Sequence, residues 1–154
     1  MIKRIKIWTI ILHSMIIIGA GHGIGILGIM DIACIPQIIE NGIQNNNFGD
    51  FGDNLILVGL ISLIGKIVLI ISLFMKKEPN KNIAGLIGLF ILWVSFYVLV
   101  SGNWNYDSLY ELAFWTGLPF LICSIVLFVL FFKKFDRIEK LNENGIENNE
   151  KASL

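Results

Sequence analysis

Five ionisable side chains lie within or beside long apolar stretches of this 154-residue chain. They are His13, His22, Lys66, Asp31 and Glu111. Imidazole, ammonium and carboxylate groups at such positions are typical of proton relays and ion paths, because burying them away from water is otherwise costly. We therefore treat these five residues as candidates for a ligand site or a polar path.

Lys66 is the most costly of the five to bury, since it falls near the middle of an apolar run at 55–75. A lysine at the centre of a membrane helix costs about 2.5–3.5 kcal/mol on insertion scales. Gly59, Ser62 and Lys66 recur at helical spacing, which predicts that the ammonium faces the interior of a helix bundle. The alternative is that the side chain snorkels towards the nearer membrane surface and serves no function beyond that.

The two histidines belong to an apolar run at 5–30. At about 1.5 Å per residue, His13 reaches the level of Lys66 if both runs start from one membrane surface. In a regular helix His22 would lie on the face opposite His13, which argues against paired ligation of a haem within one subunit. The alternative for each histidine is a neutral ring that is hydrogen-bonded to a neighbouring helix. The glycines on either side of His22 would leave its ring open to a ligand.

Four apolar runs predict an all-α fold, an integral membrane four-helix bundle. The chain is 55% hydrophobic and only 16% charged. A membrane helix needs about 20 apolar residues, and only helices satisfy their own backbone hydrogen bonds at that length in lipid. We expect a single domain over 1–140 and a disordered cytoplasmic tail over 141–154. The predicted spans cover about 5–30, 55–75, 83–101 and 110–132.

Positive charge predicts the orientation of this bundle. Lysine and arginine cluster before the first run, between the second and third, and after the fourth, whereas the connections 31–54 and 102–109 contain neither. Under the positive-inside rule both the N-terminus and the C-terminus are therefore cytoplasmic. The predicted location is the plasma (inner) membrane of a bacterium, crossed several times.

Glycines in the first run predict close helix packing. Gly21, Gly25 and Gly28 share one face of a continuous helix, and small residues let membrane helices approach closely. The alternative is a broken helix of the kind that forms binding sites in transporters. We expect glycines of the second and third runs to pack against this face, namely Gly59, Gly85 and Gly88.

Two functions fit this pattern. The first is a small transport-type or ligand-binding protein with a polar path through His22 and Lys66, with His13 near the path and Asp31 and Glu111 at an acidic outer mouth. The second is a structural or assembly subunit that docks a larger membrane partner through the glycine face of the first run. An enzyme is least favoured, because the sequence shows no nucleophile–base pair.

Few partners are implied beyond the membrane itself. Cys34 and Cys123 form neither a CxxC pair nor a metal-ligand spacing. We expect no catalytic residues, no metal and no cofactor. The expected partners are membrane lipid and a second copy of the chain or a larger membrane protein, and nucleic acid is not among them.

Overall fold

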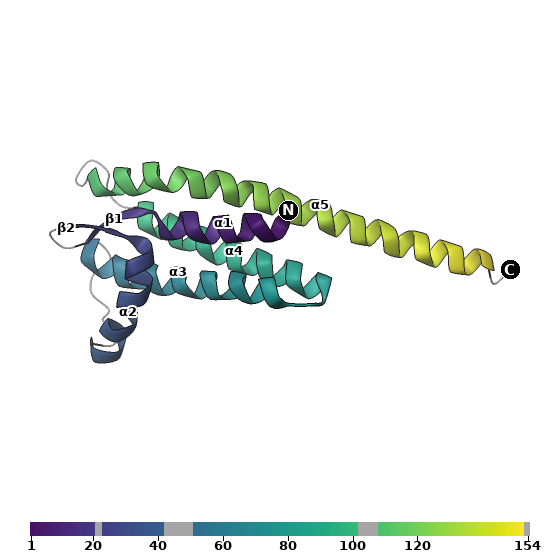
Figure 1. The fold of residues 1–154 in the computed structure, drawn as a ribbon, viewed down its shortest axis with the longest axis horizontal. Coiled ribbons are helices and arrows are strands. Elements are labelled where there is room, and N and C mark those ends of the chain that lie inside the picture. Colours follow the sequence, from purple (N-terminus) through teal and green to yellow (C-terminus); the bar gives the residue numbers. More distant parts are fainter. Residues whose placement is uncertain (21–22, 42–50, 102–107, 153–154) are drawn as a thin grey trace.

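The computed structural model describes residues 1–20, 23–41, 51–101 and 108–152, which form five helices and one antiparallel pair of strands (Figure 1). Helices α1, α3, α4 and α5 run side by side along one axis, whereas α2 projects across it (Figure 1). In chain order the elements are α1 (Ile2–Ser14), β1 (Ile17–Ala20), β2 (Gly23–Ile26), α2 (Leu27–Asn41), α3 (Phe51–Phe74), α4 (Glu78–Val100) and α5 (Ser108–Ala152).

The first apolar run is not one helix, and the predicted span at 5–30 is not among the candidate spans found in the described residues. Helix α1 ends at Ser14, the strands pair with Ile17 opposite Ile26, and α2 then begins a second helix. The physical reason lies in the composition of the two strands, which are built largely from isoleucine and glycine. β-Branched side chains and glycine both weaken a helix, and isoleucine favours a strand.

The hairpin is held by buried apolar side chains and by two hydrogen bonds from backbone N–H groups. Ile16, Ile18 and Leu27 are fully buried. The backbone N–H of Leu27 donates to the carbonyl of Ile16 at 2.9 Å, and that of Ile17 donates to Thr116 Oγ1 on α5 at 3.1 Å. Non-helical backbone away from water must find such partners within the protein.

Three of the described helices are long and apolar enough to cross a membrane, namely Leu55–Phe74, Glu78–Val100 and Tyr110–Phe135. They correspond to the second, third and fourth predicted runs. Helix α1 has 13 residues and is therefore about 20 Å long, shorter than the ~30 Å hydrocarbon core of a bilayer. The part of the chain that the structure describes thus contains three candidate spans and not the four that were predicted.

Helix α5 continues beyond the other helices as a single rod of 45 residues ending at Ala152 (Figure 1). The segment predicted as a disordered tail, 141–154, belongs to this helix as far as Ala152, and residues 153–154 lie outside the described part. Starting a helix is the costly step, whereas extending one adds a hydrogen bond for each residue fixed. A helix already held in the bundle can thus extend through this polar segment.

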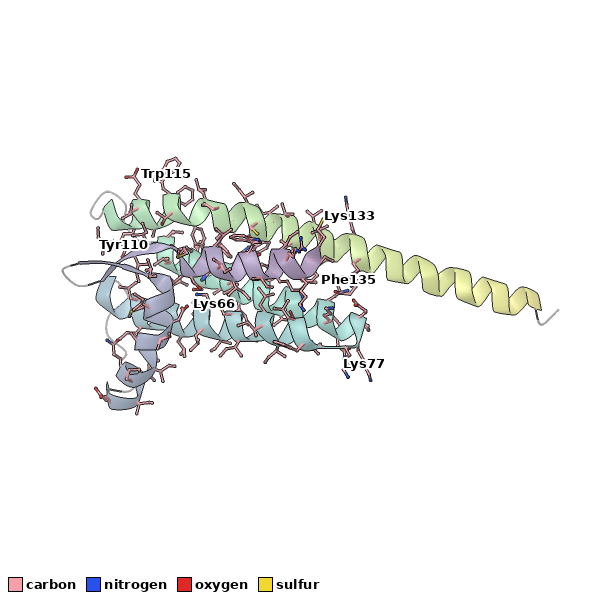
Figure 2. All side chains as sticks on the ribbon, viewed as in Figure 1. Lys66, Lys77, Tyr110, Trp115, Lys133 and Phe135 are labelled. Atoms are coloured by element: carbon pink, nitrogen blue, oxygen red, sulfur yellow. The ribbon has the colours of Figure 1, made fainter. Side chains whose placement is uncertain are left out.

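The two ends of the bundle differ in their side chains (Figure 2). Lys77 and Lys133 lie towards one end, and Tyr110 and Trp115 lie near the other. The start of α1 is at the lysine-bearing end, because Lys6 on α1 reaches the α4 residue Lys81. We call these the basic end and the aromatic end.

Close packing through glycine is found between α3 and α4. A Cβ atom added at Gly88 would lie 2.8 Å from the backbone nitrogen of Leu69 and 3.1 Å from the carbonyl oxygen of Gly65. The hydroxyl of Ser95 donates to the carbonyl of Val58 at 3.1 Å across the same interface. Small residues therefore let these two backbones approach each other.

Two of the three glycines of the predicted face lie in different elements. Gly25 lies in β2 and Gly28 in α2, so they share no helix face, and Gly21 lies outside the described residues. Gly28 instead packs against Ser14 at the end of α1. Gly59 of α3 lies against Met30 of α2. A Cβ atom added at Gly59 would lie 3.1 Å from the carbonyl oxygen of Met30.

Candidate functional site

The buried face of α1 is polar. Its buried residues are Lys6, Thr9 and His13, and each has no exposed surface. The spacing i, i+3, i+7 places them in one stripe along the helix. Helices α3 and α5 supply polar partners along this stripe, so the interior of the bundle carries a line of polar groups where an apolar core would ordinarily be packed.

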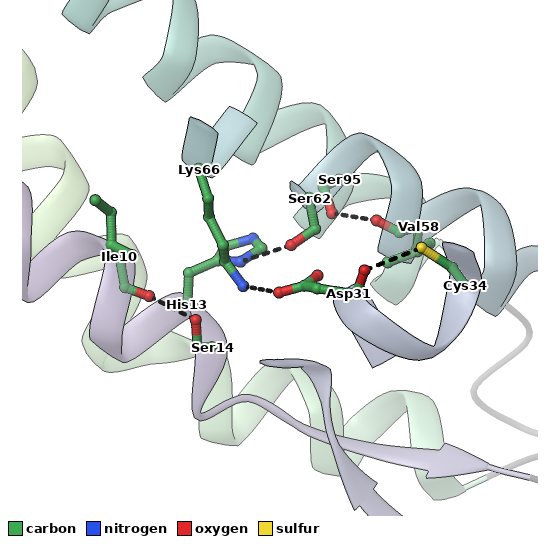
Figure 3. Close-up of polar contacts among 9 residues, drawn as sticks. All are labelled: Ile10, His13, Ser14, Asp31, Cys34, Val58, Ser62, Lys66 and Ser95. Atoms are coloured by element: carbon green, nitrogen blue, oxygen red, sulfur yellow. Dashed lines mark hydrogen bonds and ion pairs between the residues drawn. The ribbon is translucent and has the colours of Figure 1, made fainter. Parts of the chain in front are cut away.

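An ion pair lies beside the last turn of α1. The ammonium of Lys66 on α3 pairs with Oδ2 of Asp31 on α2, and both residues are at most 5% exposed. On the same face of α3, Ser62 Oγ is 3.4 Å from His13 Nδ1, so three elements meet here (Figure 3). We call His13, Asp31, Ser62 and Lys66 the histidine cluster.

Two polar atoms of the histidine cluster lack partners. Among the described side chains, His13 Nε2 and Asp31 Oδ1 are both buried without a hydrogen bond. The His13 ring stands edge-on to Phe120 at 4.6 Å between centroids, which holds its orientation. A buried acceptor and an imidazole nitrogen, both unpaired, can accept or pass a proton or bind a water molecule.

Local structure explains how Asp31 reaches the bundle. The hairpin returns the chain to the end of α1, and α2 then starts against Ser14 through Gly28. Because Gly59 has no side chain, α2 can pack close to α3, and this brings Asp31 to Lys66. Cys34, one turn further along α2, is buried and donates its thiol to the carbonyl of Asp31 at 3.1 Å.

A second polar group surrounds Lys6 at the basic end. Its ammonium donates to Ser72 Oγ at 2.8 Å and lies 5.0 Å from the centroid of the Phe131 ring. Ser72 in turn donates to the carbonyl of Leu69 at 2.6 Å. The ammonium is therefore held by neutral oxygen atoms and an aromatic face.

Thr9 lies between these two groups on α1. Its hydroxyl donates to the carbonyl of Ile5 at 2.9 Å and is 3.4 Å from Cys123 Sγ on α5. Together the three levels form what we call the polar column. Its members are Lys6, Ser72, Thr9, Cys123, His13, Ser62, Lys66 and Asp31.

The structure brings three of the five predicted site residues together. His13, Lys66 and Asp31 meet in the histidine cluster (Figure 3). Glu111 does not join them, because its side chain is exposed on α5 and accepts a hydrogen bond from Trp115 Nε1 at 3.3 Å. His22 lies outside the described residues. Within those residues no group of three or more histidine, cysteine or acidic side chains could hold a metal ion.

Sequence reasoning missed Lys6, Thr9 and Ser72. The charge pattern marks Lys6 as one of the cations near the N-terminus that predict the orientation, and not as a site residue. The available signal was the spacing of Lys6, Thr9 and His13, because polar residues at i, i+3 and i+7 in an apolar segment mark one polar face.

Comparison with known proteins does not add to this description. No family model, no curated protein and no solved structure matches the chain. The function must therefore be argued from the polar column itself.

Proposed function

We propose that the protein is a small membrane protein of transport type, in which the polar column moves protons between the two ends of the bundle. The observation that carries the proposal is the buried polar face of α1, with the Lys66–Asp31 ion pair at its aromatic end. Replacing buried ion pairs by apolar residues is often neutral or stabilising, so packing alone does not call for such groups. Histidine and carboxylate chains inside membrane helices are typical of proton relays.

The break after α1 supports the same proposal. His13 lies in the last turn of α1, directly before the chain leaves helical structure. In transporters, discontinuous segments place polar groups and free backbone ends at the binding site. The path proposed here runs through His13, Lys66 and Asp31, in place of the route through His22 and Glu111 expected from the sequence.

We also propose the membrane arrangement that goes with this function. Helices α3, α4 and α5 cross the bilayer, and α1 followed by β1 covers the remaining depth as the fourth member of the bundle. The basic end faces the cytoplasm with both termini, as the positive-inside rule requires. On this arrangement the protein lies in the plasma membrane, and we retain the expectation of a bacterial inner membrane.

Accessibility of single cysteines tests the orientation. In a variant lacking Cys34 and Cys123, we expect a cysteine replacing the exposed Gln37 of α2 to react with a membrane-impermeant maleimide on intact cells. A cysteine replacing the exposed Lys76, between α3 and α4, should react only after permeabilisation. Reaction of both positions from the same side would contradict the arrangement.

Proton flux into liposomes tests the function. Liposomes containing the protein and an internal pH-sensitive dye should acidify under an imposed potassium-diffusion potential faster than empty liposomes. His13→Leu removes the proton-carrying group and should lower the flux by about 10²-fold or more. Trp8→Leu, on the exposed face of the same helix, is the matched control and should leave the flux unchanged. Flux equal to that of empty liposomes would contradict the proposal.

A second candidate function is an assembly subunit, and one observation favours it. Helix α2 projects from the bundle with Ile29, Ile32 and Ile39 strongly exposed, while Asp31 and Cys34 face inward. A partner would then dock on α2, and not on the glycine face predicted from the sequence. If the liposomes show no flux, a stable complex that is lost in Ile32→Ser would favour this second function.

A further inference from the structure

The ammonium of Lys6 is buried without a carboxylate partner among the described side chains. Lys6 has no exposed surface, and its second hydrogen bond, to the carbonyl of Lys81, is long at 3.5 Å. The nearby carboxylate of Glu78 pairs instead with Lys81 and Lys134. A buried charge without an opposite charge is unfavourable, so this position would gain from an anion.

Asn82, on the neighbouring helix α4, is an independent second donor. Its side chain is 1% exposed, and Nδ2 has no hydrogen-bond partner among the described residues. Asn82 lies one turn before Gly85 on the buried face of α4, and a Cβ atom added at Gly85 would lie 3.0 Å from Lys6 Nζ. The Lys6 ammonium therefore lies against α4 at Lys81 and Gly85, and the unpaired amide of Asn82 belongs to the segment between them.

The surrounding field favours negative charge. Lys81 and Lys134 both repel the Lys6 ammonium, and only Glu78 attracts it. The cluster of Lys6, Lys81, Lys134 and Glu78 thus carries two positive charges in excess of its one carboxylate. The N-terminus of α4 begins at Glu78, and the positive end of the helix dipole adds to the same sign.

We propose that Lys6 and Asn82 form a binding site for an oxyanion, either the phosphodiester of an anionic phospholipid or a free phosphate. The ammonium and the amide N–H groups are all donors, as a phosphate oxygen requires. Phe131 covers Lys6 from α5 and is the side chain that turns aside to admit the ligand. Lys6 also belongs to the polar column, but anion binding here does not depend on proton movement, and its test measures binding in detergent and not flux.

Thermal melting in detergent at fixed ionic strength tests the site. We expect phosphatidylglycerol or inorganic phosphate to raise the melting temperature, and phosphatidylcholine to have no comparable effect. A response to phosphatidylglycerol alone assigns the site to a lipid headgroup, and a response to inorganic phosphate assigns it to a free oxyanion. Asn82→Leu should weaken the binding about tenfold, and Lys6→Met should abolish it.

Two further variants keep the test decisive. Lys3→Met removes an exposed charge from the same helix and should leave binding unchanged. Asn82→Asp places a carboxylate beside Lys6, and should raise the melting temperature without ligand while abolishing the response to it. If Lys6→Met fails to fold, the two Asn82 variants decide. No response in the wild type, or equal losses in Lys3→Met and Asn82→Leu, would overturn the proposal.

Discussion

Asp31→Ala is expected to destabilise the protein by about 3–5 kcal/mol, the cost of removing one partner from a buried ion pair. Lys66 is only 5% exposed, and its ammonium would remain on the inward face of α3 without the carboxylate. The variant also removes one of the contacts between α2 and the bundle. The free energy of unfolding in mixed micelles of increasing denaturing detergent measures this loss.

The reverse substitution is expected to cost about as much. Lys66→Met removes the ammonium and leaves the carboxyl group of Asp31 buried without its partner, so we again expect a loss of about 3–5 kcal/mol. The double variant Asp31→Leu/Lys66→Met should recover to within about 1 kcal/mol of the wild type, because two apolar residues replace the pair.

The double variant and a surface control make the result decisive. Coupling appears when the double variant is much more stable than the sum of the two single losses predicts. Glu111→Ala removes a carboxylate from the exposed face of α5 and should change stability by less than ~0.5 kcal/mol. Strict additivity of the Asp31 and Lys66 losses would show that the pair contributes no coupling.

Hydropathy located three helices well and failed on the first run for a physical reason. The runs containing Lys66, Gly88 and Phe120 are long, apolar and rich in leucine, and each became a candidate span. The run at 5–30 is also long and largely apolar, but its isoleucines and glycines are compatible with strand structure. Length and hydropathy cannot distinguish one helix from a helix that ends in a hairpin.

The sequence identifies individual residues of the candidate site, but it does not predict how they are arranged in space. His13 and Lys66 stand out because each is ionisable within an apolar run. The sequence predicts Asp31 at an outer mouth, because a continuous first helix carries it away from Lys66. The hairpin reverses the chain and returns Asp31 to the bundle, and that reversal depends on tertiary packing of Ile16 and Ile18.

Gly88→Leu is expected to be the most damaging substitution at the α3–α4 interface. Even the first added carbon would lie 2.8 Å from the backbone nitrogen of Leu69, and backbone atoms cannot rotate away as a side chain can. The helices must therefore separate, which loses the contact at Gly65 and the Ser95 hydrogen bond to Val58. Overpacking of this kind costs about 1–3 kcal/mol for a methylene or two, and a leucine adds four carbons.

Alanine at the same position separates packing from helix propensity. Replacing glycine by alanine favours an isolated helix by about 1 kcal/mol, so a loss of stability in Gly88→Ala must come from the close approach of α3. Gly85→Ala is the informative comparison, because its tightest contact is a side-chain carbon of Phe131, which can move. Ile87→Ala, on the exposed face beside Gly88, controls for substitution in α4 itself. If Gly88→Ala melted at or above the wild-type temperature, the close α3–α4 contact would not stabilise the bundle.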